Sequence, residues 1–284
     1  MTGVSLKAIY SVAKKEFADN VRNRWIVALT VIFAILTLLA SYVAGAQTGG
    51  GAVLGGMEET VIGLMSIAVI LIPLIAVMLG YASIAGECEN GSMGVLLSYP
   101  IRRGEVLVGK LIGLGSVIVV STVIGFGAAG ILIAATVGAE SGVAYLSFIG
   151  LTILSGFLYL SMAVLFSTIA KSRARALGMG VVLFFWSMIY GMIIFGVYMA
   201  TGGDIQGLIT GTEPFPDWLY ATIVISPTDL YQLAVMLAFG IEQVFGYTFD
   251  TPFFMTTTFA VMVQILWIEL AVILAYFSFK KRDI

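Results

Sequence analysis

The residues best able to do chemistry in this chain gather in one stretch, which runs from Gly86 to Gly113. It reads GECENGSMGVLLSYPIRRGEVLVGKLIG, and it is the one place where charges of both signs lie between two long apolar runs. Its charged residues are Glu87, Glu89, Arg102, Arg103, Glu105 and Lys110. The whole chain has no histidine and one cysteine, Cys88, so the commonest general base and metal ligand is missing. We therefore expect no catalytic residue and no metal site.

The elements that must position this stretch follow from the composition. The chain is 60% hydrophobic and 11% charged, with a mean hydropathy of +1.06. An ordinary soluble domain carries about 25% charged residues, so this composition indicates an integral membrane protein. The net charge of −2 provides no basic excess, and nucleic acid is not an expected partner.

The apolar runs predict an all-α fold with six spanning helices. About 20 apolar residues are needed to cross the hydrocarbon core of a bilayer. Before the first span, residues 5–24 place apolar and charged side chains on opposite helical faces, which predicts an amphipathic elbow helix in the membrane interface. The predicted spans are 25–46, 61–85, 111–137, 145–170, 176–200 and 255–279.

The basic residues predict the orientation of these spans. All fourteen lysines and arginines lie before the first span, in the second or fourth loop, or after the last span. By the positive-inside rule, both termini and the loop at 86–110 are expected in the cytoplasm of a multi-pass protein of the plasma membrane.

Proline predicts the shape of the charged stretch. Pro100 disfavours helical geometry at Tyr99, so a first short helix should end near Ser98. Ser98 could then cap a second helix that begins with Pro100. The sequence therefore predicts a hairpin of short helices against the membrane.

A second feature lies in the long fifth loop, residues 201–254. Ser226, Pro227 and Asp229 form a helix start signal, with Ser226 as N-cap and Asp229 reaching back as a capping box. Apolar residues then recur at helical spacing, which predicts an outer amphipathic helix over 227–245. Two roles stay open: a lid or docking surface for the substrate or an extracytoplasmic partner, and a structural brace in the lipid interface.

One ionisable residue, Glu269, falls near the middle of a predicted span, and Gln264 is close by. A carboxylate at that depth is costly, so it should face the bundle, a cavity or a partner subunit. It could belong to a substrate path or gate, or it could form a packing contact at a helix or dimer interface.

The charged stretch resembles the loop between the second and third spans of ABC transporter permeases of the ABC-2 class. The match rests on Glu89, Gly91, Leu96, Leu97, Ser98, Pro100, Arg102, Arg103 and Lys110. Two further segments, AKKEFADNVRNRWI and SPTDLYQL, are similar to the Nos-type copper-accessory permeases of nitrous oxide reductase maturation.

This resemblance implies that the stretch couples to a separate ATPase subunit. The residues implied to carry that coupling are Glu87, Glu89, Gly91, Leu96, Leu97, Ser98, Pro100, Arg102, Arg103, Glu105 and Lys110. The resemblance further implies a homodimer with two ATPase subunits, which bind the ATP and magnesium. The thirteen methionines are scattered through apolar runs, so this chain is not expected to bind copper itself.

A self-sufficient secondary transporter or an intramembrane enzyme is the alternative. The absence of histidine and of a metal-ligand cluster disfavours the enzyme. The single charge within the spans and the lack of paired broken helices disfavour the secondary transporter.

Overall fold

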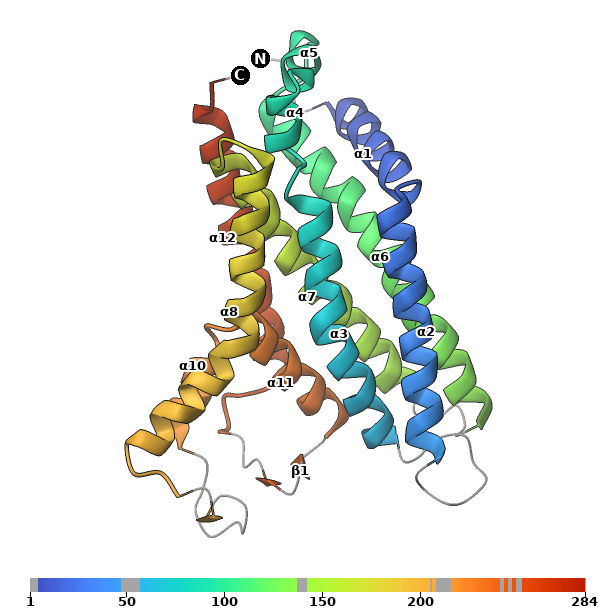
Figure 1. Cartoon of the computed structure of the whole chain (residues 1–284), viewed down its shortest axis with the longest axis vertical. Coiled ribbons are helices and arrows are strands. Elements are labelled where there is room, and N and C mark those ends of the chain that lie inside the picture. Colours follow the sequence, from blue (N-terminus) through green and yellow to red (C-terminus); the bar gives the residue numbers. More distant parts are fainter. Residues whose placement is uncertain are drawn as a thin grey trace.

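The computed structural model describes residues 5–46, 57–136, 142–204, 206–207, 216–240, 243–244, 247–248 and 252–283. The predicted helical fold class is confirmed, since long helices run side by side through most of the described chain (Figure 1). The helices are α1 (Leu6–Val21), α2 (Arg24–Ala46), α3 (Met57–Gly80), α4 (Ala85–Glu89), α5 (Ser92–Ser98), α6 (Arg103–Thr136), α7 (Gly142–Ile169), α8 (Arg173–Ala200), α10 (Asp217–Ile223), α11 (Pro227–Phe239) and α12 (Thr257–Lys281). Two short strands, β1 (Gln243–Val244) and β2 (Tyr247–Thr248), pair antiparallel.

Five helical segments of the described chain are long and apolar enough to span a membrane: Val61–Glu89, Arg103–Ile131, Tyr145–Ile169, Arg173–Ala200 and Thr257–Lys281. Two bent pairs, α1 with α2 at 68° and α10 with α11 at 112°, raise the number to seven if each pair is one span. The predicted number of six lies within this range. The chain is therefore a multi-pass membrane protein.

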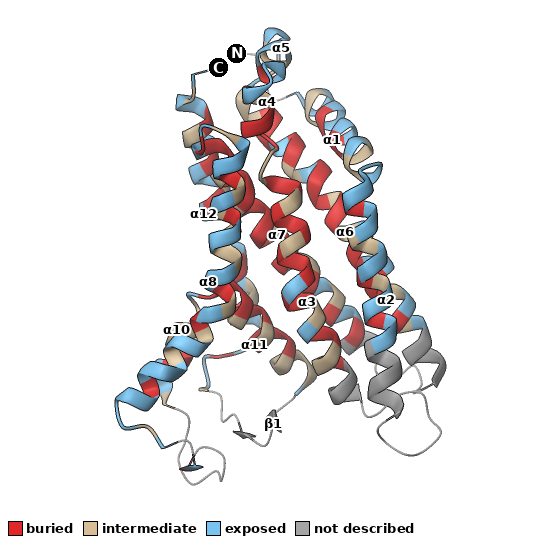
Figure 2. Ribbon diagram, viewed as in Figure 1, coloured by how far each residue is buried: buried red, intermediate tan, exposed pale blue. Residues whose placement is uncertain are grey.

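The interior of the bundle is built on α3 and α7. In their apolar segments 61% and 67% of residues are buried, against 17% in α8 and 22% in α12. Figure 2 shows the same division, with buried residues concentrated on the central helices. α8 and α12 therefore present broad apolar faces outward.

The first helix, α1, packs along α6, and two glycines make this close approach possible. A Cβ at Gly109 would lie 2.9 Å from the carbonyl oxygen of Ile9, and one at Gly113 would lie 2.5 Å from that of Ala13. Both positions therefore need a residue without a side chain.

The predicted outer helix is wrong at its C-terminal end. The helix α11 ends at Phe239, not at 245, because Gly240 adopts a left-handed conformation (φ 63°) that terminates it. Leu230, Tyr231 and Ala234 of α11 are buried, and α11 packs against α7 and α12. It therefore packs on the transmembrane bundle, which is one of the two positions that the sequence allows.

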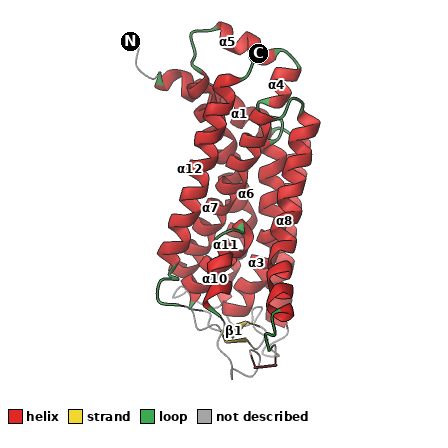
Figure 3. Cartoon of the chain, turned by 90° about the vertical axis from the view of Figure 1, so that its left-hand side faces the viewer, coloured by secondary structure: helices red, strands yellow, loops and turns green. Residues whose placement is uncertain are grey.

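The two ends of the bundle differ. The start of α1, the end of α12, and the short helices α4 and α5 lie together at one end, while β1 lies at the other (Figures 1 and 3). The segments that carry the basic residues thus share an end with α4 and α5.

Candidate coupling site

The α4–α5 hairpin forms for local reasons. Gly91 takes a φ of 75° between the two helices, a conformation that favours glycine. The helix α5 ends at Ser98 as expected, with Tyr99 extended before Pro100.

The predicted start of the next helix is wrong. The helix α6 begins at Arg103, not at Pro100, and the Ser98 hydroxyl donates to the carbonyl of Val95 in its own helix (2.7 Å). The capping group is Glu105, whose carboxylate accepts the N–H of Arg102 at 2.9 Å. Its other oxygen accepts the N–H of Ser5 at 2.6 Å, which ties the start of α1 to the start of α6.

A buried ion cluster lies beneath the hairpin. The ammonium of Lys110 (α6) is 2.6 Å from Glu16 Oε1 (α1) and 2.9 Å from Glu87 Oε1 (α4). The Lys110 side chain is only 1% exposed. A buried charge needs partners at this distance, so the cluster fixes the relative positions of three helices.

Lys15 joins the rim of this cluster. Its ammonium is 3.3 Å from Glu87 Oε1 and 3.9 Å from Asp19 Oδ2. Burial alone would lower the pKa of Lys15, but the carboxylates of Glu87, Glu16 and Asp19 raise it above its ordinary value. Glu87 Oε2 is buried without a hydrogen-bond partner among the described residues.

The hairpin is also held by α7 and α8. The Ser167 hydroxyl of α7 accepts the N–H groups of Ile84 and Ala85, at 3.0 and 2.9 Å, and so caps the start of α4. At the other end of α4, Glu89 Oε2 accepts the N–H of Arg173 (3.2 Å), the first residue of α8. The hairpin therefore contacts both helices directly.

Two arginines cap helix C-termini near this site. Arg103 donates to the carbonyls of Phe279 (2.6 Å) and Arg282 (2.7 Å) at the end of α12. Arg282 donates to the carbonyls of Ser167 and Thr168 at the end of α7. Cationic groups suit these positions because the last carbonyls of a helix lack partners and carry partial negative charge.

What remains exposed is one surface of the hairpin, which we term the docking surface. Val95 and Tyr99 are 65% and 61% exposed, although both are large and hydrophobic. The exposed residues of the docking surface are Glu89, Asn90, Gly91, Ser92, Gly94, Val95, Ser98, Tyr99, Pro100 and Arg102. Met93 is fully buried beneath it, and Leu96 and Leu97 are partly buried.

The predicted coupling residues thus fall into two groups. Glu87, Glu105 and Lys110 are internal contacts that hold the hairpin, and Arg103 binds the end of α12 and is not free at a turn. The others contribute to the docking surface or to the packing of α5.

Sequence reasoning missed Glu16, Ser167 and Arg282. The role of Glu16 could have been predicted from the sequence, because Glu16 falls on the buried face of α1 together with Val12 and Ala13. An acidic residue on the apolar face of an amphipathic helix indicates a buried cationic partner.

The other predicted site residues lie away from the hairpin. Ser226 caps α11, since its hydroxyl accepts the N–H of Asp229 at 3.3 Å, but its own N–H donates to Ile223 and not to Asp229 as a capping box would require. Gln264 is fully buried, and its side-chain nitrogen and oxygen have no hydrogen-bond partner within the described chain. Glu269 lies on the exposed face of α12, so it does not point into the bundle.

Comparison with known proteins decides the family. The family described as ABC-2 family transporter protein matches residues 10–284. The chain belongs to this family. It is 31% identical to a protein of Pseudomonas aeruginosa named Probable ABC transporter permease protein NosY, over 98% of this chain and 100% of that protein. It is 29% identical to a protein of the same name from Stutzerimonas stutzeri, over 98% of this chain and 99% of that protein.

The resemblance seen in the sequence is therefore confirmed for the ABC-2 class and for the Nos-type permeases. Within the described residues, no group of three or more His, Cys, Asp or Glu side chains is placed to hold a metal ion. The chain is a permease subunit of an ABC transporter.

Proposed function

We propose that this permease couples ATP hydrolysis in a separate ABC ATPase subunit to movement of its own helices, and that the docking surface binds that ATPase. The observation that carries the proposal is the Lys110 cluster. It joins the hairpin, through Glu87, to α6 and α1 in a single set of contacts below 3 Å. A displacement of the hairpin would therefore also displace α6 and α1.

The contact of Glu89 with Arg173 supplies a second connection, to the start of α8. Only 17% of the apolar segment of α8 is buried, so much of its surface is free of the rest of the bundle. The proposal is that ATPase closure displaces the hairpin, and that the hairpin then moves α6 and α8 together.

We further propose that two copies of the chain associate with two ATPase subunits, and that α8 forms the contact between copies. Trp186 and Met192 of α8 are 45% and 75% exposed, and Gly178 and Gly196 lie on the same helix with open space at their Cα atoms. Aromatic and methionine residues are enriched at interfaces, and glycines allow close helix approach in membranes. The exposed face of α12 contains no glycine.

A cysteine at Met192, with native Cys88 replaced by serine, should form a disulfide between two copies in membranes. A cysteine at Leu266 of α12, which is 63% exposed, is the matched control and should stay monomeric. Cross-linking at position 266 alone would place the second copy on α12.

Glu269 is exposed on α12, at a depth where lipid would surround it. A path through this bundle is not supported, because the side chain points outward from α12. A carboxylate in lipid at that depth is costly, so we propose that a neighbouring chain of the complex covers it.

Two further proposals concern the orientation of the chain in the membrane and the substrate of the complex. We propose that the chain lies in the plasma membrane with both termini and the docking surface on the cytoplasmic side, since the segments with lysine and arginine share that end of the bundle.

The complex would export a substrate or act on an extracytoplasmic substrate-binding or accessory protein. The Nos-type relatives favour a role in copper-enzyme maturation, in which this chain need not bind metal. The apolar face of α11 is covered by its own bundle, which leaves it unable to serve as a lid.

Co-purification tests the proposal. Replacement of Val95 and Tyr99 by aspartate should abolish recovery of the ATPase with the permease and leave membrane insertion unchanged. Trp218→Asp changes a residue of α10 that is 42% exposed at the other end, and it should recover the ATPase normally. Normal recovery with the Val95 and Tyr99 variant would mean that the ATPase binds elsewhere.

A further inference from the structure

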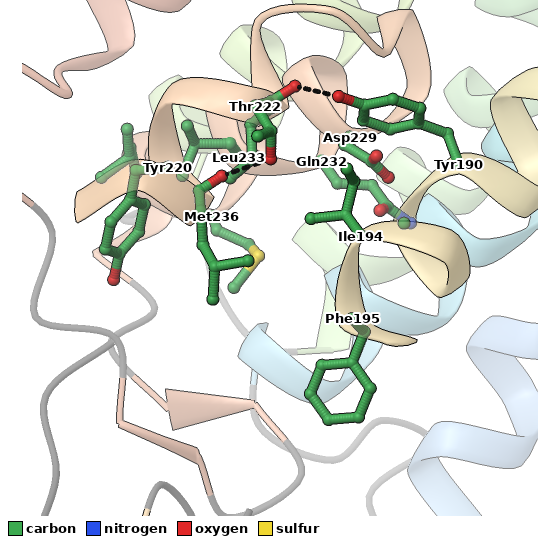
Figure 4. Close-up of a pocket in the computed structure, with 13 residues that line it drawn as sticks. Tyr190, Ile194, Phe195, Tyr220, Thr222, Asp229, Gln232, Leu233 and Met236 are labelled. Atoms are coloured by element: carbon green, nitrogen blue, oxygen red, sulfur yellow. Dashed lines mark hydrogen bonds between the residues drawn. The ribbon is translucent and has the colours of Figure 1, made fainter. Parts of the chain in front are cut away.

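A pocket of about 240 Å³ lies between α8, α10 and α11, away from the docking surface. The helices α10 and α11 lie toward the end of the bundle opposite α5 (Figure 1). Its lining is mostly hydrophobic and includes Ile194, Phe195, Leu233 and Met236 (Figure 4). This volume and lining suit a small molecule with an apolar body.

Two local features keep the pocket open. The bend of 112° between α10 and α11 holds α10 away from α11. The Tyr190 hydroxyl donates to the carbonyl of Thr222 (2.9 Å), which fixes α10 to α8 (Figure 4).

Gly191 has no side chain, so only backbone lies beside the carboxylate of Asp229. A Cβ at Gly191 would lie 3.4 Å from Asp229 Oδ1 and 3.5 Å from Oδ2, so the glycine leaves this carboxylate accessible from the pocket.

Asp229 is the one charged residue among those that line the pocket. It is partly buried, and no lysine or arginine of the described chain lies within 4.0 Å of its carboxylate. The neutral Ser226 hydroxyl lies beside it and accepts the backbone N–H of Asp229 at 3.3 Å. The carboxamide of Gln232, three residues later in α11, also lines the pocket and is neutral.

A carboxylate in an apolar pocket loses hydration, and a cation placed against it restores a favourable interaction. An aromatic ring next to that position adds attraction for a cation, and Tyr190 lies near Asp229 in this pocket (Figure 4). A divalent inorganic cation is usually held by more than one carboxylate together with neutral oxygen ligands, whereas this mostly apolar lining supplies one carboxylate.

We propose that this pocket binds a small organic cation, in which an ammonium group pairs with Asp229 and an apolar body fills the space between α8 and α11. Asp229 sets the charge preference, and Gly191 provides the room beside it. The site lies at the far end of the bundle from the docking surface, so its occupancy can be measured without an ATPase subunit.

Equilibrium binding of radiolabelled benzyltrimethylammonium to the full-length chain in lipid nanodiscs tests this proposal. The neutral isostere neopentylbenzene, used as a competitor, separates the effect of charge from that of shape. The unaltered chain should bind the cation saturably and prefer it to the isostere. Asp229→Asn should weaken cation binding about tenfold or more and remove that preference, because the charge is lost while the side-chain shape is kept.

Two further variants complete the test. Asp217→Asn removes an exposed first-turn carboxylate of α10 outside the pocket lining, and it should bind as the unaltered chain does. Gly191→Val keeps the carboxylate but fills the space beside it, so it should weaken both the cation and the isostere. Thermal unfolding of each variant checks that the chain is folded. Unchanged cation binding in folded Asp229→Asn, or no saturable binding by the unaltered chain, would overturn the proposal.

Discussion

Lys110 of α6 and Glu16 of α1 form a buried ion pair, with 2.6 Å between Nζ and Oε1. Lys110 also contacts Glu87 of α4 at 2.9 Å, so one ammonium serves two carboxylates from different helices. Since α1 packs along α6 at Gly109 and Gly113, the pair lies where α1, α6 and the hairpin meet. This arrangement makes the hairpin part of the bundle and not a loosely attached loop.

The first prediction concerns this ion pair. Lys110→Met leaves Glu16 and Glu87 buried without their cation, and it should lower the free energy of unfolding by about 3–5 kcal/mol. Thermal unfolding of the purified protein measures this loss. Lys280→Met, at an exposed position, should be nearly neutral. Combining Lys110→Met with Glu16→Gln and Glu87→Gln should recover much of the stability. A single Lys110→Met variant as stable as the parent would show that the cluster does not hold the hairpin.

The second prediction concerns the fit of α1 on α6. Gly113→Ala places a methyl group against the Ala13 backbone and should cost about 1–3 kcal/mol of stability. Gly127→Ala is the matched control in the same helix, since its Cβ would meet no atom closer than 3.9 Å. That control should be neutral or stabilising by a few tenths to about 1 kcal/mol. Equal effects of the two substitutions on the unfolding temperature would mean that α1 does not depend on this contact.

The third prediction separates two neighbouring arginines. Arg102 is exposed on the docking surface, whereas Arg103 caps the end of α12. Arg102→Glu should reduce ATPase recovery and lower the unfolding temperature less than Arg103→Glu does, because Arg102 is exposed. Arg103→Glu should lower the unfolding temperature, because it removes the donor to the α12 carbonyls and places a negative charge beside them. The assignment fails if Arg103→Glu leaves the unfolding temperature unchanged.

The fourth prediction concerns orientation. With Cys88 replaced by serine, a cysteine at Thr201, exposed at the end of α8, should react in intact cells with a membrane-impermeant thiol reagent. A cysteine at Ser172, which precedes the same helix, should react only after the membrane is opened. Sequence alone suggested Ser141 and Thr210 as outer positions, and both lie outside the described residues. The opposite labelling pattern would invert the proposed topology.

The sequence was sufficient where local chemistry decides the structure. Pro100 marked the end of α5, and Ser226 with Pro227 marked the start of α11. Gly240 also carried a usable stop signal for α11, and the predicted extension to 245 ignored it. These are local signals, which a single sequence contains.

The sequence was insufficient where distant segments meet. Lys110 stands in a charged stretch and resembles a surface residue, yet it is buried because Glu16, 94 residues earlier in the chain, reaches it. The start of α6 depends in the same way on Ser5 as well as on Arg102. Spacing predicted that the coupling residues are near one another, but not which of them hold the hairpin and which face outward.

Photo-cross-linking from position 99 tests the central claim most directly. A photoreactive phenylalanine analogue replaces Tyr99, which is 61% exposed on the docking surface, or Trp218 at the far end of the bundle as a control. Irradiation of the assembled complex in membranes should join the permease to its ATPase subunit from position 99 and not from position 218. An ATPase that cross-links from neither position, or from 218 alone, would contradict the proposed coupling site.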